Sequence, residues 1–332
     1  WPLPFPGHGT TTASVMVGRG SEETGIVGVA PGSRVVPLRA VESVVQLFDS
    51  DVARAVEHAR LSGCDLISVS VGGKGFFGLR AAIQRAVDAG MIVMAAAGNN
   101  VRIVVAPASY PNCLAVAATG PDDQPWPETS RGRAVDVSAP GWGVHVAGYR
   151  WVNGDPQARV FRSSGTSYAV AHVAGVAALW LAHHGPDTLR QRYGSRVQDV
   201  FLRVLSAEGS RVPDAWDSSD FGTGIVDATA MLTAPLPSLE PLAGARVSTG
   251  ESPVARLAAL VGVRDAELTT ALADRLAPDA DLIATISRFE GELAFHLIGD
   301  ATFRESLLGD GAGHGRGAPP AGCSPAFALA FF

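Results

Sequence analysis

Residues 164–184 read SGTSYAVAHVAGVAALWLAHH, and this stretch decides the fold class. From Ser167 onward, apolar side chains fall on nearly every side of the predicted helix. A helix of this character has no face suited to water, so it is expected in the middle of a domain. The Gly-Thr turn before it lets the backbone approach its neighbours closely, and Ser167 then stands at the N-terminus of the helix.

The surrounding sequence alternates between strand-like and helix-like segments. Short apolar runs predict strands at residues 25–30, 34–41, 66–71, 91–97, 114–119 and 134–141. Patterned segments predict helices after His8 and over residues 51–58, 79–89 and 195–207. This alternation indicates an α/β fold, a three-layer sandwich in which helices cover both faces of a mostly parallel sheet.

The composition changes near residue 233 and divides the chain of 332 residues into parts. Residues 1–233 suffice for one large core, and residues 234–253 are rich in proline and glycine, as expected of a linker. Residues 254–308 carry helical periodicity and predict a small helical C-terminal region, a candidate docking module for a partner protein. Residues 309–332 are predicted to be a flexible tail because they open on a glycine-rich run.

Charge and cysteine content exclude several classes of function. The net charge is −6 and no run of Lys and Arg occurs, so nucleic acid is not expected as a partner. No window of eighteen uninterrupted apolar residues predicts a membrane span. The three cysteines are far apart in the sequence and fit neither a disulfide framework nor a zinc spacing. The first residues have no initiator Met and no signal peptide, which favours a processed or truncated chain and leaves the compartment unassigned.

Three short clusters hold residues able to carry chemistry: GHGT at residues 7–10, AAGNN at 96–100 and SGTSYA at 164–169. Each has an ordinary structural interpretation by itself. A histidine between glycines is usually a turn residue, an Asn after a buried strand usually caps a turn, and a Ser before a helix is usually an N-cap.

Together the clusters indicate nucleophilic catalysis. A serine hydroxyl becomes an effective nucleophile when an imidazole takes its proton, a role open to His8 for Ser167. Unpaired N–H groups at a helix N-terminus stabilise a developing oxyanion, and the Asn99 side chain could add another donor. Ligands of open α/β sheets gather at the carboxyl ends of strands, where Asn99 and residues 70–73 are expected.

These segments resemble the subtilisin-like serine peptidases over roughly residues 7–233. GHGTTTAS is similar to the histidine motif of that family, MIVMAAAGNN to its oxyanion-asparagine motif, and SSGTSYAVAHVAGVAALW to its nucleophile motif. GIVGVAPGSRVVPLRAV, CDLISVSVGG, SYPNCLAVAAT, VDVSAPG and FGTGIVDATAML resemble further family segments in the family's order.

The resemblance implies a serine endopeptidase without a cofactor, acting on peptide or protein substrates. It assigns the nucleophile to Ser167, the general base to His8 and an oxyanion donor to Asn99. It also implies a substrate-binding set composed of Ser70, Val71, Gly72, Ala97 and Gly98. The two glycines of that set are expected to leave room for a bulky apolar side chain. By family, a secreted or periplasmic location is expected.

The chain also departs from the family pattern. The family order is Asp, His, Ser, and no Asp precedes His8. Asp49, Asp51, Asp65 and Asp136 belong to other segments and are not expected to substitute. Ala171 stands where the family usually has Pro, and the His172 beside it is interpreted as a packed helix residue. Residues 19–25, RGSEETG, lack the family's calcium-loop residues, so no metal is assigned.

Three hypotheses follow. The first is a serine endopeptidase whose Asp-bearing first strand is missing from the given chain. The second is a catalytically inactive peptidase fold that binds peptides or partner proteins. The third is an unrelated α/β hydrolase, which predicts a G-x-S-x-G elbow, whereas GTSYA at residues 165–169 lacks the final glycine.

Overall fold

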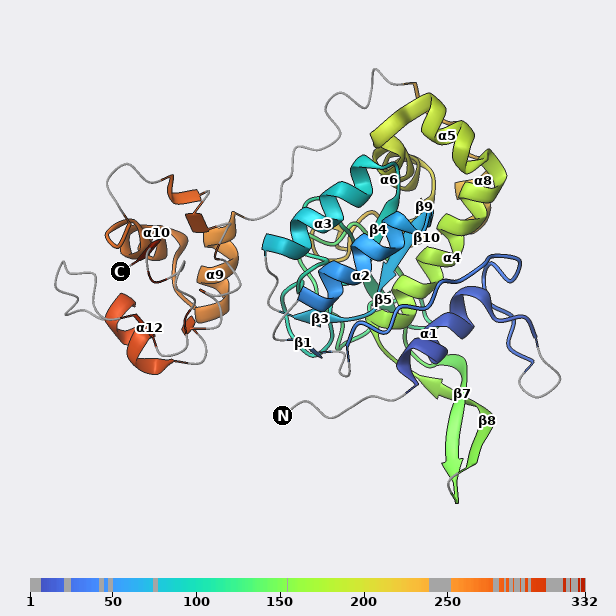
Figure 1. Cartoon of the computed structure of the whole chain (residues 1–332), viewed down its shortest axis with the longest axis horizontal. Coiled ribbons are helices and arrows are strands. Elements are labelled where there is room, and N and C mark those ends of the chain that lie inside the picture. Colours follow the sequence, from blue (N-terminus) through green and yellow to red (C-terminus); the bar gives the residue numbers. More distant parts are fainter. Residues whose placement is uncertain are drawn as a thin grey trace. The chain divides into compact units, whose positions relative to one another are not determined.

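The computed structural model describes residues 7–20, 25–41, 45–46, 50–73, 77–153, 155–238 and 252–276, with scattered residues of 281–331. The chain divides into two compact units, each described by itself (Figure 1). The first comprises residues 1–73 and 79–249, and the second comprises residues 74–78 and 250–332.

A six-stranded sheet forms the centre of the first unit. Its strands follow the order β2 (Leu66–Val69), β4 (Ile92–Ala96), β5 (Leu114–Thr119), β6 (Val137–Pro140), β10 (Ile225–Val226) and β9 (Ser210–Arg211). All neighbouring pairs are parallel except β10 with β9. The predicted mostly parallel sheet is thus confirmed.

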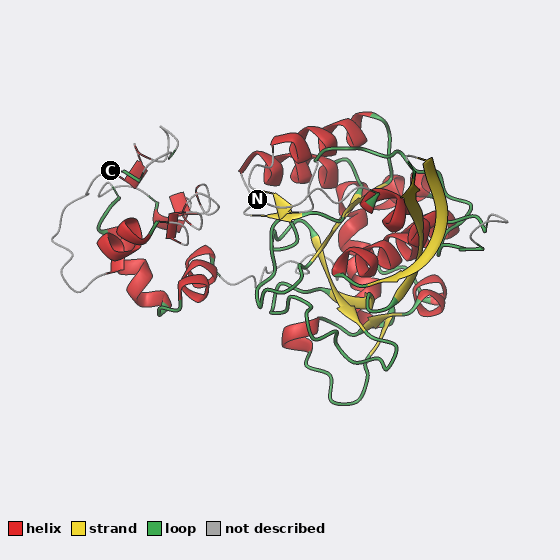
Figure 2. Cartoon of the chain, turned by 90° about the horizontal axis from the view of Figure 1, so that it is seen from below, coloured by secondary structure: helices red, strands yellow, loops and turns green. Residues whose placement is uncertain are grey.

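Helices cover both faces of this sheet, as the alternating side chains of β4 demonstrate. Ile92 and Met94 share a core with α4 (Thr166–His184) and α6 (Val197–Ala207). Val93 and Ala95 share another core with α2 (Ser50–Leu61) and α3 (Phe77–Asp88). Figure 2 shows the strands running between these helices. The three-layer α/β fold and the buried central helix are confirmed, because thirteen residues of α4 are buried.

Helix α1 (His8–Val17) packs against α4. Gly175 of α4 lets the segment that follows α1 approach this helix closely. A Cβ at Gly175 would lie 2.5 Å from the Cβ of Val29, so only glycine fits there. Backbone hydrogen bonds from Val29 and Ala30 to Val15 and Met16 hold this segment against α1. The position of His8 is therefore tied to the central helix.

The remaining elements of this unit are short or peripheral. They are β1 (Val45–Gln46), β3 (Gly72–Gly73), β7 (Val144–Val152), β8 (Asp155–Ser163), α5 (Pro186–Tyr193), η1 (Gly194–Arg196), α7 (Ser218–Phe221) and α8 (Ala228–Thr233). β7 and β8 form an antiparallel hairpin that extends away from the sheet in Figure 1. This hairpin leads directly into the turn before Ser167.

The prediction of strands over residues 25–30 and 34–41 is wrong. Apart from one bridge between Val27 and Arg19, neither segment pairs with a strand in the described part of the chain. The physical reason is the lack of a neighbouring strand, since neither segment belongs to any of the described sheets. Val35 and Val36, which a sheet would cover, are 42% and 48% exposed.

The second unit is helical. It contains α9 (Pro253–Val261), α10 (Asp265–Ala273) and α12 (Ala301–Leu308) around an apolar core. Phe331, from the segment predicted to be a tail, is buried in that core. Most of the predicted linker and of the glycine-rich run lies outside the described residues. Among the helices described in either unit, none combines the length and apolar character needed to cross a bilayer.

Gln198 offers a test of how the layers are held together. Its side chain is fully buried, accepts a hydrogen bond from the Val93 N–H at 2.7 Å and donates to the Asn112 carbonyl at 3.1 Å.

Leaving a buried polar group unpaired costs about 1–3 kcal/mol. We expect Gln198→Ala to lower the free energy of unfolding by about 2 kcal/mol or more, measured by urea denaturation. Gln157→Ala, on the exposed hairpin, is the control and should change it little; equal values for the two variants would contradict this assignment.

Candidate active site

Ser167 lies in the first turn of α4, at the end of the sheet where β4 finishes. The apolar helix holds it in place, and it is 7% exposed. Its hydroxyl donates to the carbonyl oxygen of Ser70 at 3.3 Å, and the Ser70 hydroxyl donates to the Ser167 carbonyl at the same distance. Two segments far apart in sequence therefore meet at the predicted nucleophile.

His8 begins α1 and faces the start of α4. Its carbonyl oxygen accepts a hydrogen bond from the Thr11 hydroxyl at 2.8 Å, which anchors the first turn of α1. Its ring meets that of Tyr168 edge-on, with centroids 6.1 Å apart. The Ser70 backbone is close enough to the ring to raise its pKa. His8 and Ser167 thus both lie beside Ser70.

The protonation of His8 is shifted by its surroundings. Burial of the ring lowers the pKa of His8 below its ordinary value, because desolvation disfavours the imidazolium, while the nearby Ser70 backbone partly opposes this shift. A lowered pKa keeps the ring neutral at pH 7. The neutral ring is the form that can accept a proton from a serine hydroxyl.

Asn99 follows β4 and has a fixed orientation. Its side-chain oxygen accepts from both the N–H and the hydroxyl of Thr166, each at 2.9 Å. The Thr166 hydroxyl in turn accepts from the Gly98 N–H at 3.2 Å. Since these bonds occupy the amide oxygen, the NH₂ group of Asn99 is left to donate elsewhere. Sequence reasoning missed Thr166, although the Gly-Thr-Ser turn that contains it was noticed.

The predicted substrate-binding residues flank this site. Ser70 and Val71 follow β2, but Gly72 is already paired in parallel with Val45 of β1. Across from them lie Ala97 and Gly98.

The space between the two glycines, expected to admit a bulky side chain, is occupied by Val105. A Cβ added at Gly72 would lie 2.6 Å from one Val105 methyl group, and one added at Gly98 would lie 3.1 Å from it.

The other acidic candidates have partners of their own. Asp65 forms an ion pair with Arg190, and a carboxylate oxygen of Asp136 accepts from the Ala115 N–H at 2.7 Å. Asp51 forms an ion pair with Arg54, and Asp49 lies outside the described residues. Each of the three described carboxylates is therefore held by a partner of its own.

Two further expectations concern His172 and metal binding. The Nδ1 atom of His172 lies 2.9 Å from the Tyr168 carbonyl oxygen one helical turn earlier, as expected of a packed helix residue. Within the described segments, no three or more His, Cys, Asp or Glu side chains gather in a group that could hold a metal ion.

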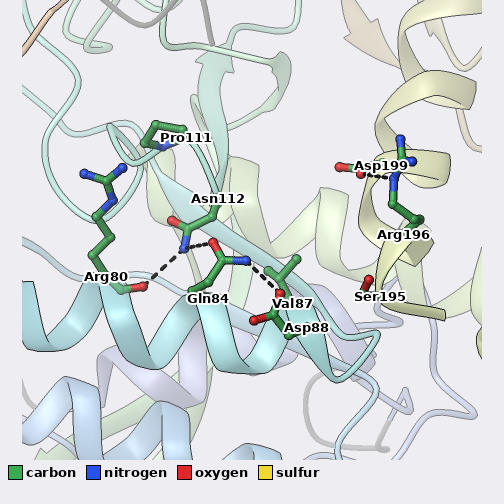
Figure 3. A pocket seen from close by; sticks show the side chains of 9 residues that line it. All are labelled: Arg80, Gln84, Val87, Asp88, Pro111, Asn112, Ser195, Arg196 and Asp199. Carbon is green, nitrogen blue, oxygen red and sulfur yellow. Dashed lines mark hydrogen bonds and ion pairs between the residues drawn. The ribbon is translucent and has the colours of Figure 1, made fainter. Parts of the chain in front are cut away.

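A cavity of about 330 Å³ lies apart from this site, between α3 and the start of α6. Figure 3 shows the Gln84 amide between Asn112 and Asp88, with hydrogen bonds of 3.1 and 2.8 Å. Arg196 and Asp199 form an ion pair at 2.7 Å on the other side. None of the predicted catalytic residues lines this cavity.

With this geometry in view, comparison with known proteins identifies the family. The model of the subtilase family, peptidase S8, matches residues 2–211, more than half of the chain. The chain belongs to the subtilase family. The separate α/β-hydrolase hypothesis is thereby excluded.

This subtilase is similar to several curated peptidases. It is 36% identical to thermitase of Thermoactinomyces vulgaris over 54% of this chain and 62% of that protein. It is 33% identical to subtilisin of Bacillus pumilus over 67% of this chain and 76% of that protein. The chain therefore spans less than two thirds of thermitase.

Among solved structures, this subtilase is similar to fervidolysin of Fervidobacterium pennivorans, described as a keratinolytic enzyme related to subtilisin. The match has a TM-score of 0.56 and 27% identity, and it covers 70% of this chain and 36% of fervidolysin.

The environment of His8 predicts its titration. Because burial lowers the pKa of His8, we expect its ring to take up a proton with a midpoint below 6.5, the ordinary value, so that it stays neutral at pH 7. NMR titration of the ring protons measures this, and a His8→Gln variant assigns the signal. A midpoint at or above 6.5 would contradict the burial described here.

Proposed function

We propose that this subtilase is a serine endopeptidase that hydrolyses peptide bonds through an acyl-enzyme on Ser167. The observation that carries the proposal is the meeting of residues 8, 99 and 167 at the N-terminus of α4. Ser167 and Asn99 are hydrogen-bonded to Ser70 and Thr166, and the His8 ring packs edge-on against Tyr168. Each of these residues has the side chain that its step requires.

In the first step, Ser167 attacks the scissile carbonyl carbon while His8 accepts the hydroxyl proton. His8 then gives this proton to the leaving amine, and water hydrolyses the acyl-enzyme by the same route in reverse. Because its pKa is lowered, the His8 ring is neutral and free to accept the proton, but burial disfavours the resulting imidazolium. The imidazolium that forms must then be stabilised by a partner.

The negative charge of the tetrahedral intermediate is stabilised at the start of α4. The Ser167 N–H belongs to the first helical turn, where backbone donors have no intrahelical acceptor. The Asn99 NH₂ group supplies a second donor, and the two bonds from Thr166 to the Asn99 oxygen hold it ready before substrate binds.

In this arrangement the Ser167 hydroxyl is directed away from His8. It donates a hydrogen bond to the Ser70 carbonyl oxygen, whereas in catalysis it must donate to His8. A carboxylate on the far side of the His8 ring would fix its tautomer and stabilise its cation. With the ring held in that way, the Ser167 hydroxyl could turn from Ser70 toward His8.

The open edge of β2 supports a place for this carboxylate. Among described residues, no strand pairs with that edge, and the buried Ser68 hydroxyl on β2 has no partner. The exposed Val35 and Val36 are apolar residues that a further strand would cover. We propose that an apolar, Asp-bearing strand completes the sheet here.

Substrate is proposed to lie extended beside Ser70, Val71 and Gly72 and to pair with their backbone. Because Val45 and Gln46 of β1 occupy part of this edge, binding requires β1 to give up a ladder of two residues. So short a ladder is easily displaced.

We also propose, separately, that the helical unit docks a partner protein.

A second candidate is an inactive subtilase fold that binds peptides. It is favoured by the direction of the Ser167 hydroxyl, which is bonded to the Ser70 carbonyl. The two candidates differ in whether Ser167 reacts.

The reactivity of Ser167 is tested with a fluorophosphonate probe, which modifies activated serines. We expect labelling that Ser167→Ala abolishes and His8→Ala slows, because the neutral imidazole activates the hydroxyl. Labelling is followed by intact-protein mass spectrometry.

Ser164→Ala is the matched control, since Ser164 precedes the same turn and donates no proton to Ser70. A chain extended by an Asp-bearing upstream strand should react faster, by the order of 10⁴ known from loss of this carboxylate in a subtilisin. Absence of labelling in that extended chain would favour the binding protein.

Asn99 is tested by its effect on turnover. We expect Asn99→Ala to lower kcat by about 10²–10³-fold with little change in KM, the loss known for this kind of donor in a subtilisin. Steady-state kinetics on a peptide substrate measure both constants. Asn100→Ala, at an exposed neighbouring position, should leave both unchanged; an equal loss in the two variants would argue against an oxyanion role.

A further inference from the structure

Two walls enclose a narrow space beside Ser167. One is the segment from Ser70 to Gly73, joined to Ser167 by the hydrogen bonds of Ser70. The other is the Ala97–Gly98 pair, joined to Thr166 through the Gly98 N–H. Since both walls are attached to the turn that carries the proposed nucleophile, the space between them is the nearest place for the side chain of the residue whose carbonyl is attacked.

The segment around Val105 crosses from one wall to the other. The Val105 N–H donates to the Ala97 carbonyl at 2.9 Å. The next residue, Ala106, pairs with Gly73 through two backbone hydrogen bonds of 2.9 and 3.2 Å. The backbone of Val105 is therefore fixed to both walls.

The Val105 side chain fills the gap that its backbone spans. The Cβ position of Gly72 lies 2.6 Å from its Cγ2 atom, closer than real Cβ contacts occur. The Cβ position of Gly98 lies 3.1 and 3.2 Å from its two methyl groups. Glycine at position 72 therefore serves to admit Val105. Gly98, which its φ of +116° and the Ser130 hydroxyl 2.8 Å from its Cβ position also require to be glycine, leaves room for the same side chain, and little depth remains for a substrate side chain.

Val105 cannot readily move out of the way. Its N–H is bonded to Ala97 and the next residue, Ala106, is bonded to Gly73, and a β-branched side chain has few χ1 rotamers to choose from. The side chain is half-buried, so its methyl groups also form part of the cleft surface. A large substrate side chain would have to displace these methyl groups or remain outside.

We infer that Val105 closes the primary specificity pocket of this subtilase, which therefore accepts substrates with a small residue, such as Ala or Ser, before the scissile bond. The inference rests on the proposed peptidase function and opposes the bulky apolar preference implied by the family resemblance. Val105 is a specificity-determining residue and takes no part in bond cleavage.

Three peptide substrates that differ only in the residue before the scissile bond, Ala, Leu or Phe, test this inference. We expect the chain to favour Ala over Phe in kcat/KM on the order of 100-fold, the scale at which pockets discriminate by size. Val105→Gly should raise kcat/KM for Phe by a similar factor and change the value for Ala little. Val105→Ala, a smaller change to the backbone, should show an intermediate preference.

Val101→Gly is the matched control, because Val101 lies on the same loop, is 43% exposed and is not among the nearest neighbours of either glycine's Cβ position. It should keep the order of preference, and thermal denaturation verifies that all variants are folded. A preference for Phe in the unmodified chain, or the same order in Val105→Gly, would overturn the inference.

Failure of the peptidase proposal is distinguishable from failure of this inference. If neither the chain nor its extended form reacts with the fluorophosphonate probe, the preference for Ala or Phe is compared by peptide binding. Peptides ending in Ala or Phe are titrated against Ser167→Ala and against Ser167→Ala with Val105→Gly. Tighter binding of the Phe peptide only when Val105 is absent supports a closed pocket, and equal binding by both proteins refutes it.

Discussion

The burial of α4 against the parallel sheet is the constraint on which the rest of the molecule depends. Since the helix is apolar on every side, it must be surrounded by protein, and β4 and β5 cover it on one side. Its N-terminus then lies beside the carboxyl end of β4, which brings Ser167 next to Asn99. Packing of α1 on the same helix adds His8. One buried helix thus fixes the positions of three residues that are distant in sequence.

The sequence predicts those parts of the fold whose patterns have a single physical interpretation. An apolar strand such as β4 and an apolar helix such as α4 can only be buried, and both were predicted correctly. Residues 34–41 were not, because an apolar run of strand length forms a strand only where a neighbour offers hydrogen bonds. Whether a neighbouring strand is present depends on the rest of the sheet, and the sequence of the run does not reveal it.

The site was predictable in its residue types but not in its hydrogen bonds. Motifs in sequence point to His8, Asn99 and Ser167, whereas the bond between Ser167 and the Ser70 carbonyl joins positions 97 residues apart. A backbone acceptor has no residue signature, so no pattern could reveal that Ser70 competes for the hydroxyl proton. The same holds for the role of Thr166, whose side chain would be an ordinary helix-start residue without Asn99 beside it.

The role inferred for Val105 concerns substrate selectivity, and the sequence alone does not reveal it either. The hydrogen bonds that fix its position come from its own backbone and from Ala106, so they do not depend on the side chain that position 105 carries. The depth of the proposed cleft can therefore change while both walls and the proposed nucleophile keep their places. The residue sits apart in sequence from every catalytic motif, and an isolated valine in an irregular segment reads as ordinary packing. Only the distances to two glycines on opposite walls distinguish it.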